Sequence, residues 1–141
     1  MSAKTILVKG KAYYDEAFAA GAITPGHLIK KDSTGKVVVH ATAGGPGEVM
    51  FAREDALQGK TVSGAYASGD PVGYLVPEKG AIINAILDAG ENVIIGDFLQ
   101  SAGNGNVEKR TGSNTIFAVA EEALNLSATG AVATRILARI I

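Results

Sequence analysis

The chain contains two related stretches, 26-GHLIKKDSTGKVVV-39 and 96-GDFLQSAGNGNVEK-109, that align at an offset of 70 residues. Both have glycine at the first and tenth positions and valine at the twelfth. The shared residues are Gly26, Gly35 and Val37 in the first stretch, and Gly96, Gly105 and Val107 in the second. A glycine-marked turn between two apolar segments is typical of a β-hairpin. Each stretch therefore predicts two short strands joined by a tight turn.

The similarity between the two stretches continues downstream at an offset of 67 residues. The matching segments are Val49-Met50 with Ile116-Phe117, and Glu54-Asp55-Ala56-Leu57 with Glu121-Glu122-Ala123-Leu124. The offset changes where the first copy has the longer glycine- and proline-rich loop 41–47. Because length changes concentrate in loops, the pattern indicates a duplicated unit. Chance similarity between glycine-rich turns is the alternative.

The remaining segments predict a mainly β protein with little helix. Eighteen glycines in 141 residues imply frequent turns. Segment 131–141 fits a strand better than a helix, because it lacks capping residues and follows Gly130. We expect a compact antiparallel β barrel or sandwich, β-tulip-like or jelly-roll-like, built from two similar hairpin units. Residues 21–141 form this single β domain, with the repeats at 26–64 and 96–130.

Residues 1–20 differ from the rest because three aromatic residues, Tyr13, Tyr14 and Phe18, lie in a small and polar stretch. The segment Asp15–Ala20 is compatible with one or two helical turns before Gly21. Two interpretations stay open. The segment is either an N-terminal arm that orders against a partner through aromatic anchors, or a packed extension of the β domain.

The composition excludes several classes of protein. There is no cysteine, so disulfide frameworks, thiol catalysis and cysteine-ligated zinc are ruled out. A formal net charge of −1 gives no basis for direct nucleic-acid binding through phosphate neutralisation. No apolar run reaches the ~20 residues of a membrane helix, and the start Met1–Lys4 lacks an apolar signal segment. We therefore expect a protein without membrane contact.

The sequence offers no catalytic, cofactor or metal site. His27 and His40 are the only histidines and are interpreted as a surface pair without a third metal ligand. Gly59-Lys60-Thr61 resembles the end of a phosphate-binding loop, but Glu54 stands where that motif needs glycine. Pairing of Glu54 with Glu121 across the two copies is less expected than two solvated strand ends. We therefore expect no enzyme activity and no cofactor.

The repeated pattern of Gly-x-aliphatic-aliphatic, a glycine-rich turn and valine resembles head decoration (cement) proteins, which stabilise the capsids of tailed double-stranded-DNA bacteriophages. The alanine- and glycine-rich, cysteine-free composition is similar too, and the resemblance covers residues 21–64 and 90–139. It implies a structural virion protein that binds the outer surface of the expanded capsid. Such a protein clamps neighbouring major capsid protein subunits and is made in the host cytoplasm.

The resemblance also implies partners and contact residues. The partners are the major capsid protein and further copies of the chain, with a homotrimer favoured and a homodimer as the alternative. A β-strand added to a capsid sheet edge and aromatic anchors are the expected contacts. The candidate residues are Thr5, Ile6, Leu7 and Val8 for the strand, and Tyr13, Tyr14 and Phe18 for the anchors. Two other functions stay open: a minor head, tail or fibre-associated β module, and a small ligand-binding or enzymatic β barrel.

Overall fold

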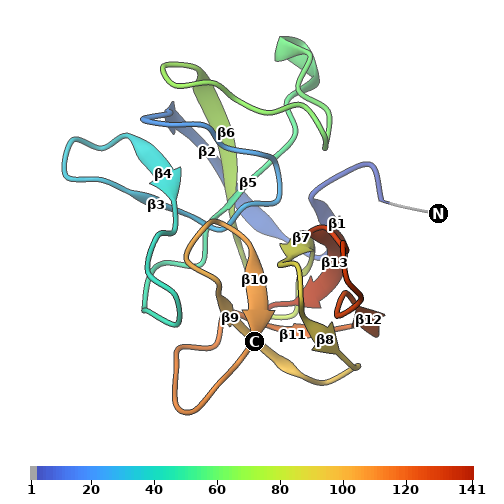
Figure 1. The fold of residues 1–141 in the computed structure, drawn as a ribbon. Helices are drawn as coiled ribbons and strands as arrows, with labels where there is room; N and C mark the ends of the chain where they lie inside the picture. The colour runs from blue at the N-terminus through green and yellow to red at the C-terminus, as the bar shows by residue number, and fades with distance from the viewer. Residues whose placement is uncertain (1–2) are drawn as a thin grey trace.

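The computed structural model describes residues 3–141 and shows a mainly β protein, as the sequence predicts. Two β barrels lie side by side, the first at the upper left and the second at the lower right of Figure 1. A 3₁₀ turn at Ala56–Gln58 is the helical element of the described chain. The first half contains β1 (Leu7–Lys9), β2 (Ala12–Phe18), β3 (Ile29–Lys31), β4 (Val37–Val39), β5 (Phe51–Ala52) and β6 (Pro71–Pro77). The second half contains β7 (Ile82–Leu87), β8 (Asn92–Val93), β9 (Phe98–Ser101), β10 (Val107–Lys109), β11 (Ala118–Ala120), β12 (Leu124–Asn125) and β13 (Thr134–Arg139).

The second barrel, barrel 2, is a closed ring of five strands. Its order is β7-β13-β11-β9-β10, and β10 returns to β7 through the parallel pair Val107–Leu87. The other four pairings are antiparallel. Closure leaves few free strand edges, so the small barrel pairs most of its backbone internally.

The first barrel, barrel 1, repeats this ring with β2-β6-β5-β3-β4. Antiparallel ladders join β2 to β6, β6 to β5 and β3 to β4. Two single bridges complete the ring: Leu28–Phe51 between β3 and β5, and the parallel bridge Ala19–Val37 between the end of β2 and β4. The two barrels therefore have the same five pairings in the same order.

The register shows that the duplication is larger than the sequence predicts. Ala19–Val37 corresponds to Leu87–Val107, which extends the repeat to β2 and β7. The offset of 70 between the β3–β4 and β9–β10 hairpins is confirmed. The predicted offset of 67 further on is too small by one residue. The Gly26 N–H donates to the Ala52 carbonyl, and the equivalent Gly96 N–H donates to the Ala120 carbonyl, so Ala52 corresponds to Ala120.

The two barrel interiors are filled by side chains at equivalent positions. Barrel 1 encloses Ala19, Ile29, Val37, Met50, Ala52, Tyr66, Val72 and Tyr74. The equivalent buried residues of barrel 2 are Leu87, Leu99, Val107, Ala118, Ala120, Leu126, Ile136 and Ala138. The Tyr66 hydroxyl donates to the Arg53 carbonyl at 2.7 Å, and burial raises the pKa of this hydroxyl to about 12. Inward positions on the five strands supply part of each core, and residues next to the strands, such as Tyr66 and Leu126, supply the rest.

A third apolar layer holds the barrels together. Leu28, Phe51 and Leu75 belong to strands or bridges of barrel 1, yet they pack with the core of barrel 2. Ile6 joins the same layer, and its neighbour Leu7 pairs with Ile83 in β7. All of these side chains except Leu7 are fully buried, so the two barrels form one packed unit.

Three sequence-based expectations need correction. Asp15 lies in strand β2, so the helical interpretation of 15–20 is wrong. His40 is 2% exposed, so the two histidines are not a surface pair. Glu54 corresponds to Glu122 and not to Glu121, because the register differs by one.

Between residues 3 and 20 the chain supplies β1 and β2, whereas residues 1 and 2 of the predicted arm lie outside the described part. No helix in the described range is long and apolar enough to span a membrane.

Candidate interaction surface

The residues predicted as a capsid-binding strand are incorporated into the fold. Ile6 is fully buried and its N–H donates to Glu54 Oε1 at 2.9 Å. Leu7 pairs with Ile83, and its side chain and that of Val8 are partly buried. Thr5 is exposed, and its hydroxyl donates to the Leu7 carbonyl at 2.9 Å. In this conformation the strand pairs with β7, and the Ile6 side chain is not available to a partner.

The three predicted aromatic anchors lie on the outside of β2. Tyr13 is 73% exposed, Tyr14 56% and Phe18 60%. Exposed aromatic residues are unusual on a monomer surface and are enriched where proteins bind one another. The anchors do not form one patch, however. Tyr14 lines a cavity of about 280 Å³ with Thr5 and Leu7, whereas Phe18 lines a different cavity of about 330 Å³.

Arg53 fixes the position of Tyr14. The Arg53 guanidinium lies 4.9 Å from the Tyr14 ring centroid, which is a cation–π distance. The backbone N–H of Arg53 donates to the Gly73 carbonyl at 2.9 Å, and a Cβ at Gly73 would lie 3.1 Å from Arg53 Nε. The glycine therefore leaves room for the arginine side chain, which stacks on Tyr14 and holds the ring at the surface.

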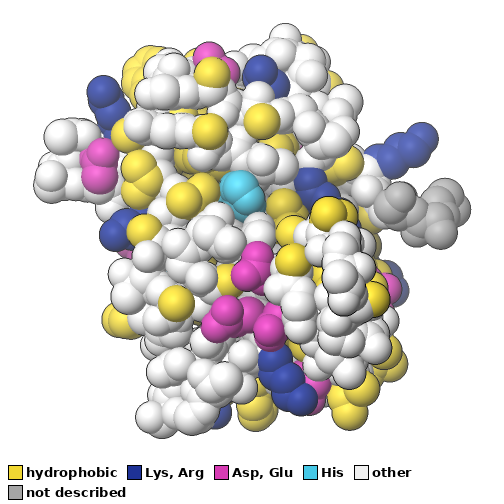
Figure 2. All heavy atoms as spheres, viewed as in Figure 1, with side chains coloured by type: hydrophobic (Ala, Val, Ile, Leu, Met, Phe, Trp, Pro, Cys, Tyr) yellow, Lys and Arg dark blue, Asp and Glu magenta, His cyan; other side chains and the backbone are white. Residues whose placement is uncertain are grey.

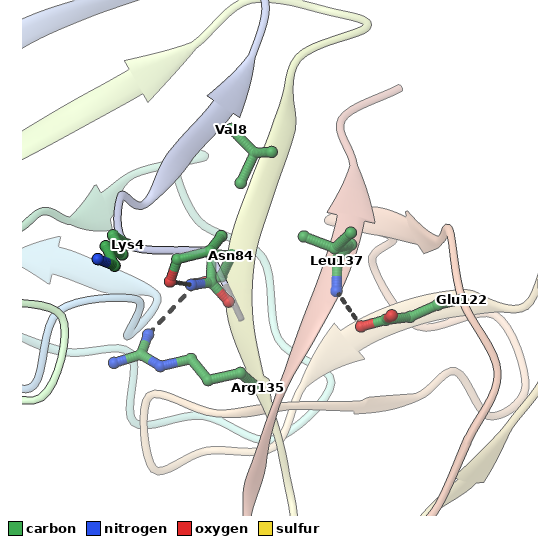
Figure 3. Close-up of a pocket in the computed structure, with 7 residues that line it drawn as sticks. Lys4, Val8, Asn84, Glu122, Arg135 and Leu137 are labelled. Carbon is green, nitrogen blue, oxygen red and sulfur yellow. Dashed lines mark hydrogen bonds between the residues drawn. The ribbon is translucent and has the colours of Figure 1, made fainter. Parts of the chain in front are cut away.

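The contact between the barrels is centred on Arg135 of β13. Its guanidinium donates to the Asn84 carbonyl at 3.3 Å and to the Val62 carbonyl, and the Asn84 amide donates to the Ala3 carbonyl at 3.3 Å. Figure 3 shows Arg135 and Asn84 side by side on the paired strands β7 and β13. Both residues line a cavity of about 440 Å³, together with Lys4 and Val8 from the N-terminal segment. Burial lowers the pKa of Arg135. The arginine thus connects the loop after β5 to two strands of barrel 2.

Both histidines belong to this contact. The Leu28 N–H donates to the Gly105 carbonyl at 2.8 Å, which places His27 against the turn between β9 and β10. Burial, followed by the charge of Arg135, lowers the pKa of His27, and Asn106 partly opposes this shift. His40 Nε2 donates to the Pro46 carbonyl at 2.8 Å, so its Nδ1 accepts from the Ser101 hydroxyl at 2.7 Å.

This serine–histidine pair resembles a nucleophile and its base in distance alone. Ser101 and His40 are 0% and 2% exposed, and the second nitrogen of the histidine already donates to a carbonyl. A substrate therefore cannot reach the serine–histidine pair in this structure. The hydrogen bond between His40 and Ser101 instead links barrel 1 to barrel 2. Between residues 3 and 141, no group of three or more histidine, aspartate or glutamate side chains is placed to hold a metal ion.

Barrel 2 has exposed apolar residues outside the predicted contact set. Ile94, Ile95, Phe98 and Ile141 are between 44% and 67% exposed. Ile94 and Ile95 lie in the turn between β8 and β9, where Gly96 has a φ of +94°, and Ile141 follows β13. On the face that Figure 2 presents, hydrophobic side chains are scattered over both barrels and acidic side chains gather near the middle. This face therefore has no broad apolar patch in the part of the chain that the structure describes.

Comparison with known proteins gives a match among solved structures. No protein-family model matches the sequence, and a search of curated proteins finds no match either. Among solved structures, the fold is similar to the crystal structure of the N base of head fiber gp8.5 in bacteriophage phi29. The TM-score is 0.62 at 13% sequence identity, and the match covers 93% of this chain and 95% of that chain. At this identity the likeness concerns the fold alone. Over nearly its whole length, this chain thus has the fold of a phage head-fiber base.

Proposed function

We propose that this chain is a structural, head-associated protein of a tailed bacteriophage, and that it attaches to the outside of the head as a fibre-associated β module. The observation that supports the proposal most strongly is the match to the head-fiber base, which spans both barrels and leaves little of either chain uncovered. The sequence resemblance to head decoration proteins favours the same location in the virion.

The surface chemistry is compatible with attachment. A head-associated structural protein needs complementary surface in many copies and no reactive group. Tyr13 and Tyr14 offer aromatic contact area on β2, and Arg53 holds Tyr14 in a fixed orientation. Rigid aromatic side chains lose little conformational entropy on binding, which favours such residues as anchors. We therefore propose Tyr13 and Tyr14 as the first residues to test for capsid contact.

Fibre attachment and capsid clamping predict different behaviour. A clamping protein binds at many sites, joins neighbouring capsid subunits and raises the stability of the shell. A fibre-associated module attaches without having to strengthen the shell. The match to a fiber base favours the second function. Clamping by a decoration protein remains the alternative that the sequence resemblance supports.

Co-sedimentation with expanded, undecorated phage shells tests the proposal. We expect saturable binding at a fixed copy number, with unchanged shell melting in the presence of the protein. Saturable binding together with an increase in shell melting temperature would instead establish clamping. Absence of binding at protein concentrations far above those of the shell sites would contradict both functions.

Two single substitutions locate the contact. Tyr13→Ser removes a 73% exposed ring from β2, and Leu57→Ser removes a 99% exposed side chain from the 3₁₀ turn. We expect the first to weaken shell binding by about tenfold, the effect of losing one anchor residue. The second variant is the control for loss of an exposed apolar side chain, and its binding should not change.

A further inference from the structure

The two barrels of one chain meet through different faces. Barrel 1 presents the turn Gly26-His27-Leu28, called here the junction turn. Barrel 2 presents a hollow around Asn84, Gly105, Asn106 and Arg135, called here the junction pocket. The fit is close, because a Cβ at Gly26 would collide with Arg135 Nη1 and lie 2.8 Å from the Asn84 carbonyl oxygen. Gly26, Leu28, Asn84, Gly105 and Asn106 are all buried.

Because the barrels are equivalent strand by strand, each face has a second version elsewhere on the molecule. The equivalent of the junction turn is Gly96-Asp97-Phe98 on barrel 2, called here the free turn. The equivalent of the junction pocket is formed on barrel 1 by Glu16, Gly35, Lys36 and Pro71, called here the free pocket. Within one chain, neither of these faces lies in the contact between the barrels.

The free faces keep the shape of a contact but are open. The free pocket is a cavity of about 330 Å³ that also contains Phe18. Phe98 is 44% exposed, whereas its equivalent Leu28 is fully buried. A Cβ at Gly96 or Gly35 would meet no atom within 4 Å in the part of the chain that the structure describes, whereas one at Gly26 or Gly105 would collide.

The chemistry of the two free faces is complementary. The free turn carries the carboxylate of Asp97 where the junction turn carries His27, and this carboxylate also lies 3.4 Å from Lys109 Nζ of its own chain. The free pocket carries the ammonium of Lys36 where the junction pocket carries Asn106. The ring of Phe98 has an apolar counterpart in Phe18, which is 60% exposed. Glu16 also lines the free pocket, but His27 contacts Asn106 at the junction, so the barrel equivalence places Asp97 against Lys36. This pair of opposite charges favours docking.

We propose that the free turn of one copy docks into the free pocket of a second copy, so that the contact between the two barrels of one chain recurs between chains. The contact is heterologous, because it joins two different faces, and repetition produces either a closed ring or a filament. We infer a ring of three chains, in which six similar barrels follow one another. This number agrees with the trimer that the sequence resemblance implies. The proposal rests on the barrel equivalence and stands whether or not the protein binds a phage head.

Chemical cross-linking tests the faces directly. The chain has no cysteine, so a bismaleimide reagent links only the cysteines that are introduced. A Lys36→Cys chain mixed with an Asp97→Cys chain should give a cross-linked heterodimer, and the doubly substituted chain should give covalent trimers. Lys36→Cys mixed with Leu57→Cys is the matched control and should give only background cross-linking. Equal yields in the two mixtures would overturn the proposal.

Measurement of mass in solution tests the same contact without cross-linking. Size-exclusion chromatography with light scattering should give about three times the chain mass of 14.4 kDa. Lys36→Asp should raise the dissociation constant of the ring by at least about tenfold, and the added change Asp97→Lys should restore most of the affinity. Circular dichroism of each variant shows whether the barrels stay folded. A folded wild-type monomer at all accessible concentrations, or a second change that restores nothing, would overturn the proposal.

Discussion

Gly26 and Gly96 have nearly the same backbone, with φ +95° and +94°, but different surroundings. Alanine at either position forces an L residue into the left-handed region, which costs about 1–2 kcal/mol. At Gly26 the new methyl group also collides with Arg135, and such overpacking costs a further ~1–3 kcal/mol. Gly26→Ala should therefore lower the free energy of unfolding more than Gly96→Ala.

Urea denaturation of both variants measures this difference. The comparison should be made in the Lys36→Asp background, so that loss of assembly does not contribute to the Gly96 result. Equal destabilisation by the two substitutions would mean that the contact around Arg135 adds nothing to stability.

His27 makes the stability depend on pH. Its pKa is lowered by burial and by Arg135, so the unfolded chain binds a proton more readily than the folded one. Stability is therefore greatest above the ordinary histidine pKa of about 6.5 and falls as the pH decreases toward the lower, folded-state value. One such group gives a slope of at most ~1.4 kcal/mol per pH unit.

Thermal denaturation between pH 7.5 and 5.5 should thus show a falling melting temperature, and His27→Gln should flatten this dependence. An unchanged slope in the variant would assign the acid sensitivity to other groups.

At the scale of elements, β1 and β2 have different importance for the fold. β2 is one of the five strands of barrel 1, whereas β1 adds to an edge of β7 outside both rings. Deletion of residues 1–9 should leave both barrels closed but remove the buried Ile6, with a loss of about 2–5 kcal/mol as for other large truncations in a core. Deletion of residues 1–20 should prevent folding of barrel 1.

Amide NMR spectra distinguish these outcomes. Well-dispersed signals from barrel 1 in the 1–20 deletion would show that β2 is not required and would favour the interpretation of this segment as an arm.

The elements that were predictable from the sequence are those with local signals. The hairpin at 32–35 is marked by Asp32, whose Oδ1 accepts from the N–H groups of Thr34 and Lys36, and by Gly35 with φ +84°. The bridges that close barrel 1 join residues far apart in sequence and leave no local pattern. The role of Arg135 in the contact between barrels was not predictable for the same reason, since its partners Asn84 and Val62 come from distant segments. The shift of one residue at Glu54 was concealed by the two adjacent glutamates, Glu121 and Glu122.

For the whole molecule, we predict one cooperative unfolding transition. The apolar layer between the barrels is continuous with the core of barrel 2, so neither barrel can open without exposing it. Differential scanning calorimetry of the Lys36→Asp variant, in which assembly does not contribute, should give equal calorimetric and van't Hoff enthalpies. Two separate transitions would show that the layer holds the barrels together only weakly.

The order of strands along the chain also has a consequence for synthesis on the ribosome. Barrel 1 is complete once residue 77 has emerged, whereas β7 and the rest of barrel 2 follow only afterwards. During that interval the outward side chains of Leu28, Phe51 and Leu75 have nothing to cover them, and such transient apolar surface promotes aggregation. Nascent chains that stall between residues 77 and 139 should therefore bind chaperones more strongly than the finished protein does.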